Sequence, residues 1–359
     1  MNKLLFLKMF VLFLAITLLL SGCTLSFNTG LNSDSGNAND GGIFKSLNKG
    51  VSWAQKTLVQ TVNVRKSFSG IDIIFLTLDP SDNKALYAGS FDNGLFYSYD
   101  AADSWQLAAS LGKLTITGVA VDPADKCVIY ATAANKVFKS EDCSRNWAQI
   151  YFDNDVRTVV SSLVIDHANS NNVFIGTDKG YIIKSSDKGA SWRALDKFSG
   201  RVDKIVISPV SSKIMFAGTT ASGIFRSVNG GDKWEKLADQ LKDFDGSNRF
   251  SDLVIVKSEK AVIFLATDFG LLKSADDGTS WSKIDLLTAE AQAKIYSIAV
   301  NPQDVKEIYY TTATTFYHSL DSGKNWIAKK LPTSRAGFKL LLDPKNPALV
   351  YLAARQVNK

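Results

Sequence analysis

Histidine, cysteine and blocks of like charge are all scarce in this chain. Its 359 residues include two histidines and three cysteines, and no cysteine has nearby Cys or His residues that would complete a metal site. Lys and Arg outnumber Asp and Glu by only 41 to 35, and the charges form no long block of one sign. We therefore expect no metal, no cofactor and no nucleic-acid partner.

Proline is rare as well, with only 7 residues, whereas 45% of the residues are hydrophobic. Such a chain can bury a large core, which excludes a disordered protein. Its length alone would suggest about two domains, but barrels and propellers run longer as single units. Internal repeats must therefore decide the domain organisation.

The N-terminus predicts a secretory signal in residues 1–22, because Lys3 and Lys8 are followed by an apolar run from Val11 to Leu20. The run ends in Leu-Ser-Gly-Cys, which resembles the lipobox of bacterial lipoproteins. That resemblance implies cleavage before Cys23 and attachment of diacylglycerol to its thiol. The alternative is an uncleaved membrane helix with an incidental cysteine.

Residues 23–42 are predicted to be the lipidated cysteine and a flexible tether, because Thr24 to Gly42 is rich in Asn, Ser, Asp and Gly. The lipid would supply the membrane affinity. We expect a protein of the bacterial cell envelope that faces the periplasm or the exterior.

A pattern close to Ser-x-Asp-x-Gly-x-Ser-Trp recurs seven times, and all 7 tryptophans of the chain end one of its copies. We call these copies the turn segments. They are Ser46–Trp53, Ser98–Trp105, Ser140–Trp147, Ser185–Trp192, Ser227–Trp234, Ser274–Trp281 and Ser319–Trp326. The spacings between their first residues are 52, 42, 45, 42, 47 and 45, a period typical of propellers and solenoids.

The turn segments resemble the Asp-box, or BNR repeat, of sialidases, sortilin-type receptors, xyloglucan-degrading glucanases and the photosystem II assembly factor. All of these are propellers, so the resemblance implies that fold but says little about function.

Each residue type in a turn segment has a physical role. The Asp or Asn oxygen can accept backbone N–H bonds and close a hairpin turn, and the glycine permits a positive φ. The terminal Trp is predicted to pack in the core against a neighbouring blade. Ala102 and Ser144 replace the glycine, so we expect those two turns to be strained or differently shaped. The predicted structural residues are Asn48, Trp53, Asp100, Trp105, Asp142, Trp147, Asp187, Trp192, Asn229, Trp234, Asp276, Trp281, Asp321 and Trp326.

Upstream of most turn segments, the pattern of short apolar runs and Asp-Pro turns predicts further strands, which gives four strands per repeat. The first turn segment lacks two upstream strands, whereas Phe338 to Ala354 supplies two strands without a turn segment. We therefore predict an all-β, seven-bladed β-propeller over residues 43–359. One blade would combine N- and C-terminal strands, which removes the exposed edges of an open array.

Cys127 and Cys143 are equidistant from the expected hairpin turn at Asn135, so an antiparallel register predicts a disulfide between them. The alternative is two free thiols. His167 and His318 occupy repeat positions where other blades hold ordinary turn or strand residues, so we interpret both as structural.

Catalysis is not expected from this sequence. It has no Arg-Ile-Pro motif of the kind with which sialidases open, and it has length for only one propeller, whereas the xyloglucan enzymes place paired acids between two. Four loop carboxylates could still be considered as a general acid/base pair. They are Asp153, Asp155, Asp243 and Asp245.

Cations recur shortly before most of the predicted innermost strands, at nearly one repeat offset. They are Lys113, Arg157, Arg201, Arg249, Lys294 and Arg335. One hypothesis is a basic ring around one mouth of the propeller, which would attract an anionic partner. The other is a set of ordinary solvated loop cations. We favour a protein-binding or assembly module, with a glycan-binding propeller and a glycoside hydrolase as the alternatives.

Overall fold

The computed structural model describes residues 39–61, 66–258 and 260–357. The chain divides into two units, residues 1–35 and 36–359, and all the described strands belong to the second. The predicted signal in residues 1–22, the acylated Cys23 and most of the tether lie outside the described residues. No helix in the described part is long and apolar enough to cross a membrane.

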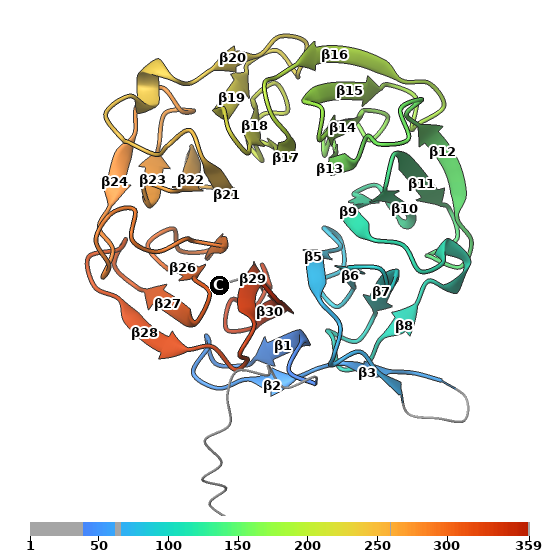
Figure 1. Cartoon of the computed structure of the whole chain (residues 1–359), viewed down its shortest axis with the longest axis horizontal. Helices are drawn as coiled ribbons and strands as arrows, with labels where there is room; N and C mark the ends of the chain where they lie inside the picture. Colours follow the sequence, from blue (N-terminus) through green and yellow to red (C-terminus); the bar gives the residue numbers. More distant parts are fainter. Residues whose placement is uncertain (1–38, 62–65, 259, 358–359) are drawn as a thin grey trace, which may run out of the picture. The chain divides into compact units, whose positions relative to one another are not determined.

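Seven four-stranded antiparallel sheets form a ring of blades, which confirms the predicted propeller (Figure 1). Six blades are each built from four consecutive strands, numbered from the innermost outward. These are β5–β8 (Ile73–Leu78, Leu86–Ser90, Leu95–Ser98, Gln106–Leu107), β9–β12 (Ile116–Asp122, Asp125–Ala133, Lys136–Ser140, Ala148–Phe152), β13–β16 (Val160–Ile165, Val173–Thr177, Tyr181–Ser185, Arg193–Lys197), β17–β20 (Val202–Ile207, Met215–Thr219, Gly223–Ser227, Glu235–Lys236), β21–β24 (Phe250–Lys257, Ala261–Thr267, Leu271–Ser274, Ser282–Ile284) and β25–β28 (Ser297–Val300, Ile308–Thr311, Thr315–Ser319, Ile327–Lys330).

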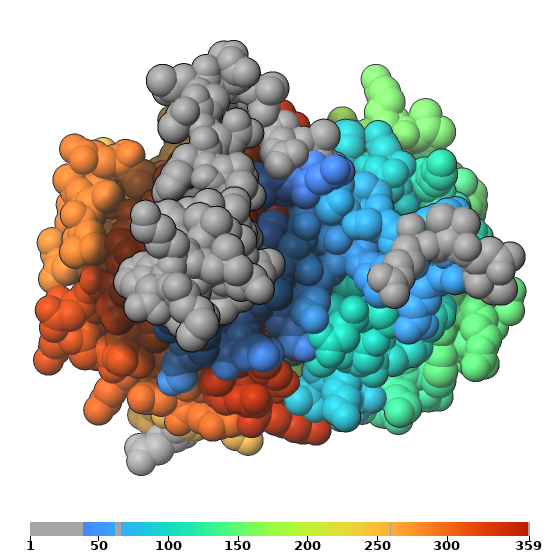
Figure 2. All heavy atoms as spheres, turned by 90° about the horizontal axis from the view of Figure 1, so that it is seen from below, coloured from blue at the N-terminus to red at the C-terminus, as the bar shows by residue number. Residues whose placement is uncertain are grey.

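The seventh blade joins the two ends of the chain. Its inner strands are β29 (Ala336–Leu342) and β30 (Val350–Arg355), and its outer strands are β1 (Gly42–Ser46) and β2 (Ala54–Gln55). Phe44 of β1 lies opposite Leu352 of β30 in an antiparallel register. Figure 2 shows this blade from its outer side, with the blue N-terminal residues beside the red C-terminal ones. The predicted closure is therefore confirmed.

The seven turn segments share one hydrogen-bonding pattern. In the segment that begins at Ser185, the serine Oγ donates to Asp187 Oδ1 over 2.7 Å and accepts from the Gly189 N–H over 2.7 Å. Asp187 Oδ1 also accepts from the Ser191 N–H over 2.8 Å. The same three bonds recur in all the other segments. These residues hold the turns together, as the sequence predicts.

Ala102 and Ser144 adopt φ angles of 67° and 69° at the position that is glycine in the other turns. The five glycines at this position have φ between 78° and 93°, for example 93° at Gly189. The two turns therefore keep the common shape and are not differently shaped. Each turn loses some free energy of folding, because a residue with a Cβ atom adopts the left-handed backbone conformation there.

The prediction that all seven tryptophans are core residues is only partly correct. All seven directly precede an outermost strand at the rim of the ring, where Trp105 and Trp234 are buried and the other five are only half-buried. Trp105 is covered by an extra hairpin, β3 (Leu58–Val59) and β4 (Lys66–Ser67), and by Phe68, whose ring meets its indole edge-on. This insertion explains the longer spacing between the first two turn segments.

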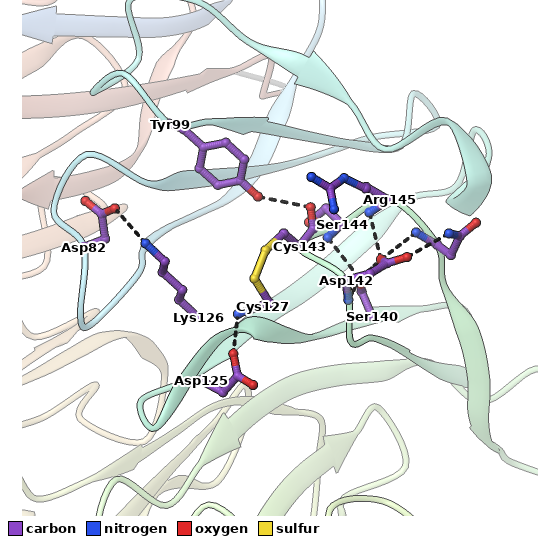
Figure 3. Close-up of a disulfide and its surroundings, with 11 residues drawn as sticks. Asp82, Tyr99, Asp125, Lys126, Cys127, Ser140, Asp142, Cys143, Ser144 and Arg145 are labelled. Carbon is purple, nitrogen blue, oxygen red and sulfur yellow. Dashed lines mark hydrogen bonds and ion pairs between the residues drawn. A yellow bond between two sulfur atoms is a disulfide. The ribbon is translucent and has the colours of Figure 1, made fainter.

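Cys127 and Cys143, the pair that the sequence predicts, form a disulfide (Figure 3). It connects the beginning of β10 to the turn segment after β11, where the Cys143 N–H also donates to the Cys127 carbonyl oxygen. The Tyr99 hydroxyl of the preceding blade donates to the Cys143 carbonyl oxygen over 3.2 Å. The disulfide therefore lies where two blades meet.

Candidate functional site

All six predicted cations lie on one face of the ring. Each stands one to three residues before the innermost strand of a blade, and all innermost strands begin at the same face. We call this face the mouth face. Its loops connect the outermost strand of one blade to the innermost strand of the next (Figure 1).

Four of the six cations are paired with carboxylates, so the set is not a ring of free positive charge. Nitrogen–oxygen distances are 3.0 Å for Arg157 with Asp155 and for Arg201 with Asp203, 3.4 Å for Arg249 with Asp268 and 2.5 Å for Arg335 with Asp72. Within the described ranges, Lys113 and Lys294 make no ion pair, and Lys294 lies 5.5 Å from the centre of the Tyr296 ring. Only Asp155 lies in the same loop as its cation, because Asp203 is on β17, Asp268 follows β22 and Asp72 precedes β5.

The innermost strands contain a second group of charges, which the sequence analysis missed. Lys204 on β17, Asp252 on β21 and Lys339 on β29 lie opposite Gly218, Ala266 and Ala353 in the second strands of their blades. Equivalent register places the three at one level near the mouth face. We call them the central cluster.

The carboxylate of the central cluster is buried and fully bonded. Asp252 is 2% exposed, and its Oδ1 lies 2.7 Å from Lys204 Nζ on the neighbouring blade. Its Oδ2 accepts from the Ser297 hydroxyl over 2.9 Å and from the Ile298 N–H over 3.1 Å. Burial by itself would raise the pKa of Asp252, but the charges of Lys204 and Lys339 and these hydrogen bonds hold that pKa at about 2. Asp252 is therefore ionised at any physiological pH.

Lys339 is the member of the central cluster that pairs with neither of the other two. Among the residues that the structure describes, its ammonium makes no hydrogen bond or ion pair, and it lies 5.7 Å from the centre of the Phe338 ring. Burial lowers the pKa of Lys339, and Lys204 lowers it further, while Asp252 and Asp203 oppose the shift. Since Lys204 and Asp252 balance each other, the net charge of the central cluster depends on Lys339.

Aromatic rings border the same sector. The Tyr296 and Phe338 rings lie 6.2 Å apart, and the Arg355 guanidinium lies 4.6 Å from the centre of the Phe338 ring. Next to them, Asp203 accepts from the Thr220 hydroxyl over 2.6 Å and pairs with Arg201. Burial raises the pKa of Asp203 in spite of these partners. Charged residues within innermost strands that otherwise consist mainly of Ile, Val and Leu are the sequence signal that could have revealed this group.

The four loop acids considered for catalysis are not brought together. Asp153 Oδ1 accepts from the Asp155 N–H over 2.8 Å, which is a local turn, and Arg157 lowers the pKa of Asp155 by hydrogen bonding and charge. Asp243 and Asp245 belong to a different loop, before β21.

Both histidines contact neighbouring polar groups. His167 Nε2 lies 2.9 Å from the Ser208 carbonyl oxygen of the next blade. His318 Nε2 lies 2.9 Å from Oε1 of Glu307, whose side chain is 3% exposed. Tyr309, Asn301 and Lys49 also bond to Glu307, and Lys49 belongs to the seventh blade. The Lys49–Glu307 pair therefore joins two blades, whereas His318 and Glu307 belong to the same blade.

Two hollows lie away from the centre. One, of about 220 Å³, lies between the β18–β19 turn, the end of β20 and the loop before β21. The other, of about 530 Å³, lies between the turn segments that follow β11 and β15. Within the described part of the chain, no group of three or more His, Cys, Asp or Glu could hold a metal ion.

No protein-family model and no curated protein sequence matches this chain. Solved structures do resemble it, and their identities are low enough that the likeness shows the fold alone. The GH74 xyloglucanase from Xanthomonas campestris has 17% identity and a TM-score of 0.62, over 79% of this chain and 51% of that one. This chain therefore spans about half of the enzyme's length.

Two further structures share the fold. YCF48 from Cyanidioschyzon merolae has 14% identity and a TM-score of 0.62, over 79% of this chain and 95% of that one. The extracellular domain of BT4673 from B. thetaiotaomicron has 13% identity and a TM-score of 0.61, over 84% of this chain and 39% of that one. These neighbours are seven-bladed propellers that include an enzyme, an assembly factor and a sensor domain, so the fold alone does not select a function.

Proposed function

We propose that this protein is an extracytoplasmic, lipid-anchored propeller that binds a partner protein, and that an acidic segment of the partner enters the mouth face at the central cluster. The observation that carries this proposal is the side chain of Lys339, which has no hydrogen-bond or ion-pair partner among the described residues and lies beside the Lys204–Asp252 pair. The N-terminal signal and the lipobox-like sequence before Cys23 support the location.

A carboxylate is the group that suits this position. A partly desolvated ammonium without a counterion is costly, and an incoming carboxylate would give it a charge-assisted hydrogen bond. Lys204 is 35% exposed and Lys339 is partly exposed, so solvent and a ligand can reach both. The rings of Tyr296 and Phe338 would contact the apolar part of a peptide.

A structural neighbour agrees with binding as the activity, since one structure is of YCF48 bound to D1 peptide, with 14% identity and a TM-score of 0.60 over 80% of this chain and 94% of that one. We propose a binding role rather than catalysis for the present chain. Two of the loop acids considered for catalysis, Asp153 and Asp155, are engaged in a local turn and an ion pair.

The test uses a fluorescent six-residue oligoglutamate peptide and measures its binding by anisotropy. We expect Lys339→Gln to weaken binding at least tenfold, or about 1.4 kcal/mol. Lys345→Gln is the matched control, because it removes the same charge from an exposed turn on the opposite face. Equal losses in the two variants would show only general attraction between charges, and an unchanged affinity in Lys339→Gln would overturn the proposed site.

A further inference from the structure

The hollow of about 220 Å³ lies at the rim of the ring, where the chain takes a longer path between two blades. After β20 the chain forms a short 3-10 helix, Asp239–Leu241, and a loop that ends at Arg249 before β21 begins. In Figure 1 this path follows the outside of the ring before turning inward to β21. We call the hollow the rim cavity.

The loop that builds the rim cavity is a defined structure. The Ser247 hydroxyl donates to the Leu241 carbonyl oxygen over 3.2 Å, and the Ser247 N–H donates to the Phe244 carbonyl oxygen over 3.1 Å. Gly246 has a φ of 85°, which turns the chain back towards the blade. The Phe244 ring packs edge-on against Phe269, 5.2 Å away between ring centres.

The floor of the rim cavity is apolar, whereas its edge carries polar groups without partners. Ile224, Leu237 and Leu241 are buried beneath it. Four polar side chains of the lining make no hydrogen bond or ion pair with any residue that the structure describes. They are Lys236, Lys242, Asp245 and Asn248. Apolar walls with a few polar groups are the usual composition of a small-molecule site.

The chemistry of the lining selects a kind of ligand. Two ammonium groups against one carboxylate leave a net charge of about +1, which favours an anion. Asp245 accepts hydrogen bonds and Asn248 both donates and accepts, so the ligand should also carry hydroxyl groups. The volume is below that of pockets for drug-sized ligands, which is roughly 300 Å³ or more.

We propose that the rim cavity binds a single acidic sugar unit, with its carboxylate at Lys236 and Lys242 and its hydroxyls at Asp245 and Asn248. This site is independent of the proposed partner-binding function, because the central cluster lies on the innermost strands and the rim cavity lies at the periphery.

The test titrates sodium glucuronate into the protein by calorimetry, up to about 50 mM because single sugars bind weakly. Glucose and acetate are titrated in parallel. We expect glucuronate to bind at least tenfold more tightly than either, because only glucuronate offers a carboxylate together with hydroxyls. Absence of glucuronate binding would overturn the proposal, and so would equal binding of acetate, which would indicate a simple anion site.

Two variants locate the site. Lys242→Gln should weaken glucuronate binding about tenfold with an unchanged melting temperature, since Lys242 is exposed and its side chain has no partner among the described residues. Lys179→Gln is the control, because Lys179 is an exposed lysine outside the cavity, in the β14–β15 turn of the preceding blade, which corresponds to the β18–β19 turn at the cavity. Equal effects of the two variants would place glucuronate elsewhere.

Tighter binding of glutamate than of glucuronate would assign the cavity to amino acids and overturn the sugar proposal. Lys339→Gln should leave glucuronate binding unchanged, so the two proposals fail separately.

Discussion

Replacing Trp105 and Trp192 with alanine, one at a time, tests how the propeller uses two tryptophans from equivalent positions. Trp105 is 0% exposed, and its indole N–H donates to the Lys56 carbonyl oxygen over 2.9 Å. The backbone N–H of Trp105 donates to the Leu58 carbonyl oxygen, and the Trp105 carbonyl oxygen accepts from the Gln60 N–H. These bonds hold the β3–β4 hairpin against the Trp105 side chain, which packs with Val59 and Phe68. Trp192 is half-buried, and its indole donates over 3.1 Å to Gly189 within its own turn.

Truncation of a fully buried aromatic side chain costs about 3 to 5 kcal/mol. Trp105→Ala should cost the upper part of that range, because it also leaves the Lys56 carbonyl oxygen without its donor. For Trp192→Ala we expect about half as much, since half of that side chain stays in water in the folded state. The sequence alone would assign the full cost to Trp192.

Urea denaturation followed by circular dichroism measures both free energies of unfolding, with the slope of the transition checked for constancy. Trp326→Ala, at another half-buried tryptophan, serves as a second comparison. If Trp192→Ala were as costly as Trp105→Ala, burial would not control the contribution of these tryptophans and the reasoning would be refuted.

Four further predictions concern the turns, the closure, the pH dependence and the anchor. Gly323→Ala should destabilise the protein by about 1 to 3 kcal/mol more than Gly230→Ala in urea denaturation, because a Cβ atom at Gly323 would lie 2.2 Å from Ile284 Cγ2, whereas one at Gly230 meets nothing within 4 Å. Deletion of residues 336–359 removes β29 and β30 and exposes the edge of β1, so it should cause unfolding or aggregation, and a soluble truncation with a cooperative melt would contradict the closure. Burial would raise the pKa of Glu307, but hydrogen bonds from Lys49, Tyr309, Asn301 and His318 lower it to about 2. Ionised Glu307 therefore stabilises the fold at pH values above the pKa that it has in the unfolded chain, and this stabilisation is lost as pH falls towards 2. Burial lowers the pKa of His318, so the protein also loses stability as pH falls through the pKa that His318 has in the unfolded chain. The urea midpoint of Glu307→Gln should therefore fall less than that of the unchanged protein between about pH 5 and pH 3. Mass spectrometry of the N-terminal peptide should find Cys23 acylated and residues 1–22 absent, and an unmodified peptide spanning Gly22 to Thr24 would contradict the anchor.

The sequence alone predicted the number of blades, their closure and the turns that connect their outer strands. Each turn segment is defined within eight residues, and its Ser–Asp hydrogen bonds are local, as between Ser185 and Asp187. Local bonds of this kind can be read from residue order. The closure also followed from the order, because an incomplete repeat at each end predicts one shared blade.

How charges and aromatic rings meet between blades follows from the tertiary structure and not from the order of residues. Lys204 and Asp252 are 48 residues apart, and Lys49 and Glu307 are 258 apart, yet each pair is in direct contact. The pairing of Arg335 with Asp72, and the burial of Trp105 under an inserted hairpin, likewise depend on which segments become neighbours. The repeat pattern fixes the fold of each blade, whereas the contacts between side chains of different blades depend on the register and rotation of every strand around the ring.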